Sequence, residues 1–513
     1  MKPVLAGRHG ASEASASVFS LWATIVATTL VAAVALLVHY CVSFGLLAFA
    51  PEWTAPLLIG GITGLASGAS WKRAAAGTAI GLVVGVSVAR PWFIGNPISE
   101  LGGFMVSAAM FVLLGSAVSC AVALWLSKSA RRGRTEWVAA IVLVGAIVGG
   151  MWATTGMVNA GAFSGGANSL NQLLAVRPEL GNTPQDHDYY LRLFYDVHDG
   201  APYYDSVARI WLADSTGGNG LPVGVTSYRL PTVFYLWLLL PARGDAIPWG
   251  FLVFATLAAA AGFSIGAQLS RPGVAVLGAL TVAVAYLLLA TTTWVTFVDG
   301  WGMAFSLTGI ALFIASVRRD SRRLLWAAVA ACLAGAVLRE LLVYPLVLAA
   351  ASTLLLPSEK RWRETWPWLA GLACFAAVYA AHIHAIAGRV SPRLGYGFWL
   401  RGGPGHLLAT VQFFGLYFGG KPWLMPGLVM VGIAGAVCVV RTERRLSVFL
   451  VVATTAPLLA FLVFGNGGQE TASGAVSGYW GILVVPIALA LVPLAIDRLL
   501  AAFNVTAEEG RSQ

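Results

Sequence analysis

The sequence predicts an all-α, polytopic integral membrane protein with about 14 transmembrane helices. Of the 513 residues, 58% are hydrophobic and 11% are charged, and the mean hydropathy is +0.78. Apolar runs of about 20 residues, the length that a helix needs to cross a bilayer, recur along the chain. This combination excludes an ordinary soluble domain, in which about a quarter of the residues are charged.

The predicted spans follow one another with short connections, apart from the long polar interval at residues 160–229 and the connection at 388–421. Two apolar pieces, 230–241 and 405–419, are too short to cross the hydrocarbon core, which predicts re-entrant or interfacial helices. The runs of spanning length lie near residues 18–50, 55–70, 74–89, 101–127, 136–159, 247–267, 272–291, 298–317, 324–338, 340–357, 367–387, 422–440, 446–465 and 478–498.

Basic residues predict which side of the membrane each connection faces. If 230–241 does not cross, most of the 32 lysines and arginines fall on one side, which the positive-inside rule makes the cytoplasm. Both termini are then cytoplasmic, and residues 160–229 lie outside. Alanine, glycine and arginine richness suggests a GC-rich bacterial genome, and we expect the chain in a bacterial inner membrane with that loop in the periplasm. Because the basic residues cluster between spans, the net charge of +10 does not indicate nucleic acid as a partner.

The distribution of polar residues predicts three regions. Residues 1–135 form an N-terminal membrane region of four helices that carries few charges. Residues 136–360 form a central membrane module with an external loop at 160–246. Residues 361–513 add C-terminal membrane helices with a second external loop at 388–421.

The polar loop holds an unusual concentration of acid. Six of the 22 acidic residues lie between Asp186 and Asp214, and Asp186 and Asp188 are only two positions apart. Such carboxylates can accept a proton from a hydroxyl, or bind a divalent cation such as Mg²⁺ or Mn²⁺. They can equally cap a helix or remain solvated. Residues 188–212 carry seven aromatics, which predicts short interfacial helices broken at Gly200-Ala201-Pro202.

Several motifs together resemble the GT-C superfamily of membrane glycosyltransferases. The acidic pair precedes Tyr189-Tyr190, and Gly-Ala-Pro-Tyr-Tyr follows at 200–204. Ser-Tyr-Arg-Leu-Pro at 227–231 then leads into the short apolar piece. Two further segments agree: Val-Asp-Gly at 298–300 begins a span, and Arg-Glu at 339–340 lies between two apolar runs. The resemblance covers roughly residues 136–360. The superfamily includes mannosyl- and arabinofuranosyltransferases.

This resemblance implies an enzyme that transfers a sugar from a polyprenyl-phosphate donor, with inversion, to a hydroxyl of a glycan, lipid or protein on the outer face. It implies a role in glycan biosynthesis of the cell envelope. Asp188 would be the general base, with Asp186 as its partner or as a shared metal ligand. No other cofactor is implied. Residues expected to bind the donor phosphate or substrate are Arg339, Arg229, Asp299, Glu340, Tyr189, Arg393 and Arg401.

Plainer roles and other functions stay open from the residues alone. Arg339 could simply pair with Glu340 to close a helical hairpin, and Asp299 could cap its helix. A secondary transporter or flippase would place ionisable residues at mid-membrane, whereas these charges fall at predicted external ends. An envelope polysaccharide polymerase or ligase would use a basic external loop nearer the C-terminus, such as 388–406. His382 and His384 form a weak metal motif.

Overall fold

The computed structural model describes part of the chain, and all secondary structure in that part is helical. Contacts divide the chain into two compact units, Met1–Ala153 and Thr154–Gln513. In the first unit, the described residues include the short apolar helix Ala140–Trp152, and the four predicted spans before residue 130 lie outside them. The described ranges are 137–152 without 139 and 146, 155, 184–214, 228–241, 244, 246–290, 293–356, 358–389, 402–414, 424–439, 443–464 and 479–512.

The second unit contains the elements that position the site. Its α-helices are α7 (Pro184–His198), α8 (Tyr203–Asp214), α9 (Thr232–Leu238), α10 (Ile247–Leu269), α11 (Pro272–Ala290), α12 (Val298–Arg319), α13 (Arg322–Leu338), α14 (Tyr344–Ser352), α15 (Ser358–Ile386), α17 (Pro404–Gln412), α18 (Leu424–Cys438), α19 (Arg444–Ala460) and α21 (Val485–Ser512). Short 3₁₀ turns lie between them, among which Glu340–Val343 and Tyr479–Leu483 matter for the site.

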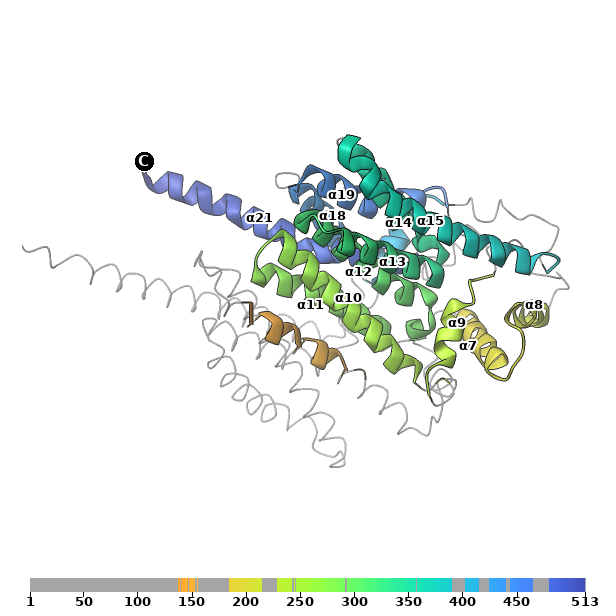
Figure 1. Ribbon diagram of the computed structural model, residues 1–513. Helices are drawn as coiled ribbons and strands as arrows, with labels where there is room; N and C mark the ends of the chain where they lie inside the picture. The colour runs from red at the N-terminus through yellow and green to blue at the C-terminus, as the bar shows by residue number, and fades with distance from the viewer. Residues whose placement is uncertain are drawn as a thin grey trace, which may run out of the picture. The chain divides into compact units, whose positions relative to one another are not determined.

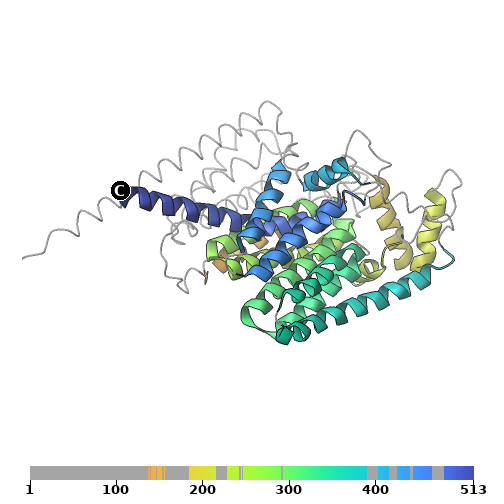
Figure 2. The ribbon, with the colours of Figure 1, turned by 90° about the horizontal axis from the view of Figure 1, so that it is seen from above.

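Within the described residues, four helices are long and apolar enough to cross a membrane. They are α10, α11, α12 and the Lys360–Ile386 part of α15. Helix α10 packs on both α11 and α12, and α12 packs on α13 (Figure 1). Helix α18 packs along α21, which also contacts α11 (Figure 2). The structure thus confirms an all-helical fold with apolar helices of membrane-spanning length, and the count of about 14 spans stays a prediction.

Three segments compare directly with the sequence prediction: the start of one span, the short apolar piece and the break in the polar loop. Helix α15 begins at Ser358, nine positions before the apolar run that predicts it, because a polar and tryptophan-containing turn extends the same helix. The apolar piece 230–241 contains α9, a helix of seven residues. At about 1.5 Å per residue, α9 is too short to cross a bilayer, as the sequence predicts. The break at 200–202 is also confirmed, because α7 ends at His198 and α8 begins at Tyr203.

A glycine pair sets the distance between α10 and α11. A Cβ added at Gly262 would lie 2.5 Å from the carbonyl oxygen of Gly278, so the two backbones touch. We expect Gly262→Ala to lower the free energy of unfolding by about 1–3 kcal/mol, because the helices must separate to admit the methyl group. Thermal unfolding of the purified protein in detergent measures the change.

Gly427 in α18 provides the matched control. A Cβ added there meets no heavy atom within 4 Å. Gly427→Ala should therefore leave the melting temperature unchanged, or raise it slightly through the better helix propensity of alanine. Equal destabilisation by both alanines would contradict the close approach of α10 and α11.

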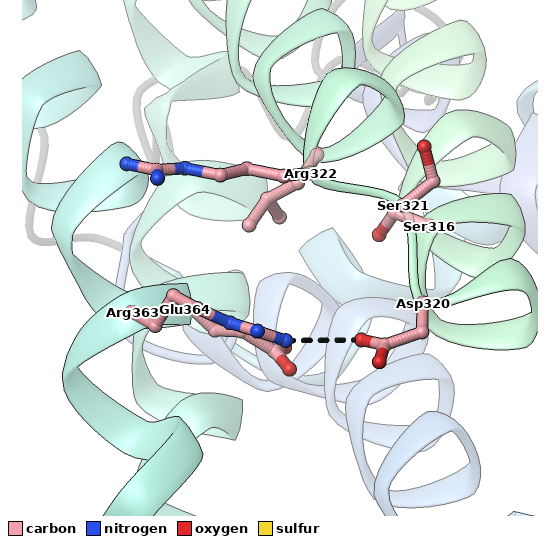
Figure 3. Close-up of a pocket in the computed structure, with 7 residues that line it drawn as sticks. Ser316, Asp320, Ser321, Arg322, Arg363 and Glu364 are labelled. Carbon is pink, nitrogen blue, oxygen red and sulfur yellow. Dashed lines mark hydrogen bonds and ion pairs between the residues drawn. The ribbon is translucent and has the colours of Figure 1, made fainter.

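The basic segments that predict the cytoplasmic side meet at one end of the helices. Arg363 of α15 lies 3.2 Å from the carboxylate of Asp320, which directly follows α12, and Lys360 lies 3.6 Å from it. Arg445 of α19 pairs with Glu364 of α15. Figure 3 shows Asp320 facing Arg363, with Arg322 of α13 beside them. The end of α12 and the starts of α13, α15 and α19 therefore gather here, and Asp299 and Arg339 belong to the opposite ends of α12 and α13.

An aromatic cluster joins the three loop helices to the bundle. Helices α7, α8 and α9 lie close together (Figure 1), and α9 also contacts α13. Phe234 of α9 contacts Tyr190 of α7 at 6.1 Å and Tyr203 of α8 at 5.3 Å between ring centroids. Trp237 continues the cluster to Trp301 of α12 at 5.9 Å. These aromatic side chains are buried, so this part of the loop is folded onto the helices by apolar packing.

Candidate functional site

Four of the residues singled out in the sequence come together in one charged cluster, which consists of Arg229, Asp299, Arg339 and Glu340. The Arg339 Nε donates to Asp299 Oδ1 at 2.7 Å, and its Nη1 donates to Glu340 Oε1 at 2.9 Å. Arg229 Nη1 donates to the same Glu340 oxygen at 3.1 Å. The cluster therefore links α12, the turn after α13 and the segment before α9.

Local geometry explains how these side chains meet. Arg339 follows α13 in an extended conformation, with φ −144° and ψ 106°, so the chain turns and Glu340 begins a 3₁₀ turn. Helices α12 and α13 approach closely at Gly302 and Gly335, because a Cβ on Gly302 would lie 2.9 Å from the Gly335 oxygen. The same Cβ would lie 3.0 Å from Arg339 Cβ. The glycines thus let Arg339 lie against the first turn of α12, where Asp299 is found.

The cluster is buried and its formal charges balance. The exposed fractions are 0% for Arg339, 1% for Asp299, 13% for Glu340 and 14% for Arg229. A buried charge is costly unless it is paired, and here two guanidinium groups face two carboxylates. Among the described residues, Arg339 Nη2, Asp299 Oδ2 and Glu340 Oε2 are buried without a hydrogen-bond partner. The cluster therefore retains polar atoms that can bind a ligand or water.

Arg229 stays charged despite its surroundings. Burial opposes the charge, but the carboxylate of Glu340 favours it, and the pKa of Arg229 stays well above its ordinary value. Its backbone is held by Tyr203, whose hydroxyl donates to the Arg229 carbonyl oxygen at 2.7 Å. Burial also raises the pKa of the neighbouring Tyr228 to about 12, and the Tyr228 hydroxyl donates to the Arg389 carbonyl oxygen at 2.8 Å. These hydroxyls act as structural donors at neutral pH.

A large cavity opens beside the charged cluster. Its volume is about 740 Å³, and three members of the cluster, Arg229, Arg339 and Glu340, line it. The remaining wall is almost entirely apolar and aromatic. It comes from the turn after α13, from α14 and α15, from α19 and the residues directly after it, and from the chain at 479–484. These wall residues are Leu341, Val343, Tyr344, Val347, Leu348, Tyr379, Ala456, Pro457, Ala460, Phe461, Phe464, Trp480, Leu483 and Val484.

Sequence reasoning missed the residues of this wall. Tyr344 is the first residue of α14 and Tyr379 is a single aromatic residue within α15, so neither belongs to a motif with a recognisable spacing. In the folded chain, the Tyr344 hydroxyl donates to the Leu483 carbonyl oxygen at 2.8 Å and so ties two sides of the cavity together. An apolar chamber with charge at one place suits an amphiphilic ligand that carries a polar head and an apolar tail.

The predicted acidic pair lies within α7. Asp186 and Asp188 belong to the helix Pro184–His198, and their side chains are outside the described part of the structure. Tyr189 contacts Tyr190 at 5.5 Å between ring centroids, and Tyr190 contacts Phe297 at the same distance. Phe297 directly precedes α12. The helix that carries the acidic pair is therefore packed near the start of α12, which holds Asp299.

The other predicted residues divide between described and undescribed parts. Arg393 and Arg401 lie outside the described residues. Arg389 pairs with Asp205 of α8 at 2.8 Å, and buried His382 lies 3.0 Å from the Tyr204 hydroxyl. These two contacts attach α8 to the end of α15. Among the described residues, no group of three or more histidines, cysteines, aspartates or glutamates could hold a metal ion.

Comparison with known proteins adds no further family information. No family model, no curated protein and no solved structure matches the chain.

Proposed function

We propose that the protein is a membrane glycosyltransferase of the GT-C type, which moves a sugar from a polyprenyl-phosphate donor to a hydroxyl acceptor. The observation that carries this proposal is the apolar cavity that ends on the charged cluster. We place the enzyme in a bacterial inner membrane, with both termini in the cytoplasm and the cavity near the periplasmic face. The basic contacts among α12, α13, α15 and α19 support this orientation, because they lie at the other end of these helices.

The cavity matches the two chemical parts of such a donor. Its volume falls in the range of about 300–1,000 Å³ that is typical of ligand pockets. The apolar wall can hold the first part of an isoprenoid chain, and the arginines can bind its phosphate through charge-assisted hydrogen bonds. Leu341, Val347 and Phe464 line the cavity and are also exposed on the surface. A longer chain can leave the cavity past these side chains and continue into the lipid.

The proposed reaction divides its roles between the two ends of the donor. The Asp188 carboxylate accepts the proton of the acceptor hydroxyl, with Asp186 as its partner. The acceptor oxygen forms a bond to the anomeric carbon, while the bond from that carbon to the phosphate oxygen breaks. The bonding electron pair goes to the departing lipid phosphate. Arg339 and Arg229 stabilise this negative charge.

A bulky side chain in the cavity tests the site. Ala456→Trp in α19 should reduce binding of a polyprenyl-phosphate donor at least tenfold, because the indole occupies space that the chain needs. Leu459→Trp is the matched control, since Leu459 is on the same helix but is exposed and does not line the cavity. Donor binding is measured in lipid nanodiscs. Equal binding by both variants would place the donor elsewhere.

A transfer assay tests the reaction itself. Purified protein in nanodiscs receives polyprenyl-phosphate sugars and a membrane extract as the source of acceptors. Mass spectrometry should detect the free lipid phosphate together with a glycosylated product. Movement of intact donor across the membrane, without cleavage of the sugar–phosphate bond, would instead indicate a flippase.

A further inference from the structure

Glu340 occupies the position between the two arginines of the charged cluster. Its Oε1 accepts hydrogen bonds from Arg339 Nη1 at 2.9 Å and from Arg229 Nη1 at 3.1 Å. Two guanidinium groups that converge on one oxygen form an anion site, and here the protein supplies the anion itself. Glu340 also lines the cavity, so any phosphate bound by these arginines must share them with its carboxylate.

We propose that Glu340 determines which charge the site accepts, and that it favours a singly charged phosphodiester over a doubly charged phosphomonoester. This inference rests on the proposed function in that it takes the charged cluster as the binding site of the lipid phosphate. It assigns to Glu340 a role in specificity, in addition to holding the arginines together.

The reason is the charge balance of the cluster. Among the described residues, Asp299 and Glu340 pair with Arg339 and Arg229, so the charged cluster itself has no net positive charge to offer a further anion. A phosphodiester adds one charge, whereas a phosphomonoester carries about −1.5 to −2 near pH 7. Repulsion from the Glu340 carboxylate therefore acts more strongly on the monoester, and low exposure reduces its screening by water and salt.

The proposed reaction gives this preference a consequence. The sugar donor is a phosphodiester, and the lipid phosphate that leaves is a phosphomonoester. A site that binds the diester better than the monoester releases its product and accepts the next donor. Removing the charge of Glu340 should therefore increase the affinity for the product more than the affinity for the donor.

The test is equilibrium binding of three probes with the same chain: farnesyl methyl phosphate, farnesyl phosphate and farnesol. Calorimetry in nanodiscs gives each dissociation constant for the full-length protein and for Glu340→Gln, whose amide oxygen can still accept from the arginines. We expect the wild-type protein to bind the diester more tightly than the monoester. In the variant, affinity for the monoester should rise about tenfold, with a smaller rise for the diester.

Glu364→Gln is the matched control, because Glu364 also pairs with a buried arginine, Arg445, but at the opposite end of the helices. It should leave the ratio of the two affinities unchanged. An unchanged ratio in Glu340→Gln, or a fall in both affinities, would overturn the inference. If Glu340→Gln does not fold, the affinities of the wild-type protein test the inference. Binding of the monoester as tightly as the diester, or more tightly, would contradict the charge preference.

The outcomes also separate this inference from the proposed function. Binding of the probes requires no sugar transfer, so the expected ratio without transfer would support the role of Glu340 and contradict the enzyme. Sugar transfer by the wild-type protein, together with an unaltered ratio of diester to monoester affinity in Glu340→Gln, would support the proposed enzyme and overturn the role of Glu340. If neither phosphate binds more tightly than farnesol, the charged cluster is not a phosphate site and the inference fails.

Discussion

Arg339→Ala is expected to lower the free energy of unfolding by about 3–5 kcal/mol. Arg339 is fully buried and supplies the hydrogen bond to Asp299 Oδ1 at 2.7 Å. Without the guanidinium, the Asp299 carboxylate is left buried beside the end of α13 with its charge uncompensated. Thermal unfolding in detergent measures the loss, and a lower yield of folded protein should accompany it.

The double variant Arg339→Ala, Asp299→Ala provides the control for this prediction. Removing both charges eliminates the unpaired carboxylate, so the double variant should melt above Arg339→Ala alone. Additive destabilisation by the two substitutions would contradict a direct ion pair. Binding separates structure from function in the same variants: Arg339→Ala should weaken donor binding more than acceptor binding. Equal loss of both would mean that Arg339 is purely structural.

Asp188→Asn is expected to reduce the rate of sugar transfer by about 10²–10⁴-fold, because asparagine cannot accept the proton of the acceptor hydroxyl. Asp186→Asn should also reduce the rate strongly through its partner role. Donor binding and melting temperature should change little. Initial rates with a polyprenyl-phosphate sugar measure the effect once an acceptor is identified in the membrane extract.

Asp199→Asn is the matched control for the acidic pair. Asp199 lies in the exposed turn between α7 and α8, within the same acidic loop. The Asp199→Asn variant should transfer sugar at the wild-type rate. Full activity in both Asp186→Asn and Asp188→Asn would show that the base lies elsewhere. A rate that each variant recovers with added Mn²⁺ would indicate a metal-binding role for the pair.

The helices of the central module could largely be predicted from the sequence. Runs of apolar residues at 247–267, 272–291 and 298–317 correspond to α10, α11 and α12, because a helix can bury apolar side chains on every face in a bundle or in lipid. The break between α7 and α8 follows from Gly200 and Pro202. Such features depend on neighbouring residues, and the sequence shows these directly.

The candidate site was predictable in part. Arg339 and Asp299 attract attention because an ionisable residue inside an apolar run needs a partner or a function. The sequence suggested Glu340 as the partner of Arg339. The structure adds Asp299 as a second partner of Arg339 and Arg229 as a second partner of Glu340, and both lie far from Arg339 in the chain. The cavity wall could not be predicted, because Tyr379, Pro457 and Trp480 resemble ordinary packing residues until distant helices bring them together.

The sequence alone determined that this protein is helical and apolar enough for a membrane, and that its charges are confined to a few segments. Those properties follow from composition and from periodicity over one helix. Only the tertiary structure decided that the close approach of α12 and α13 at Gly302 and Gly335 brings Arg339 against Asp299. The physical reason is that a buried charge and a cavity wall are both completed by partners from other helices, and packing determines which partners these are.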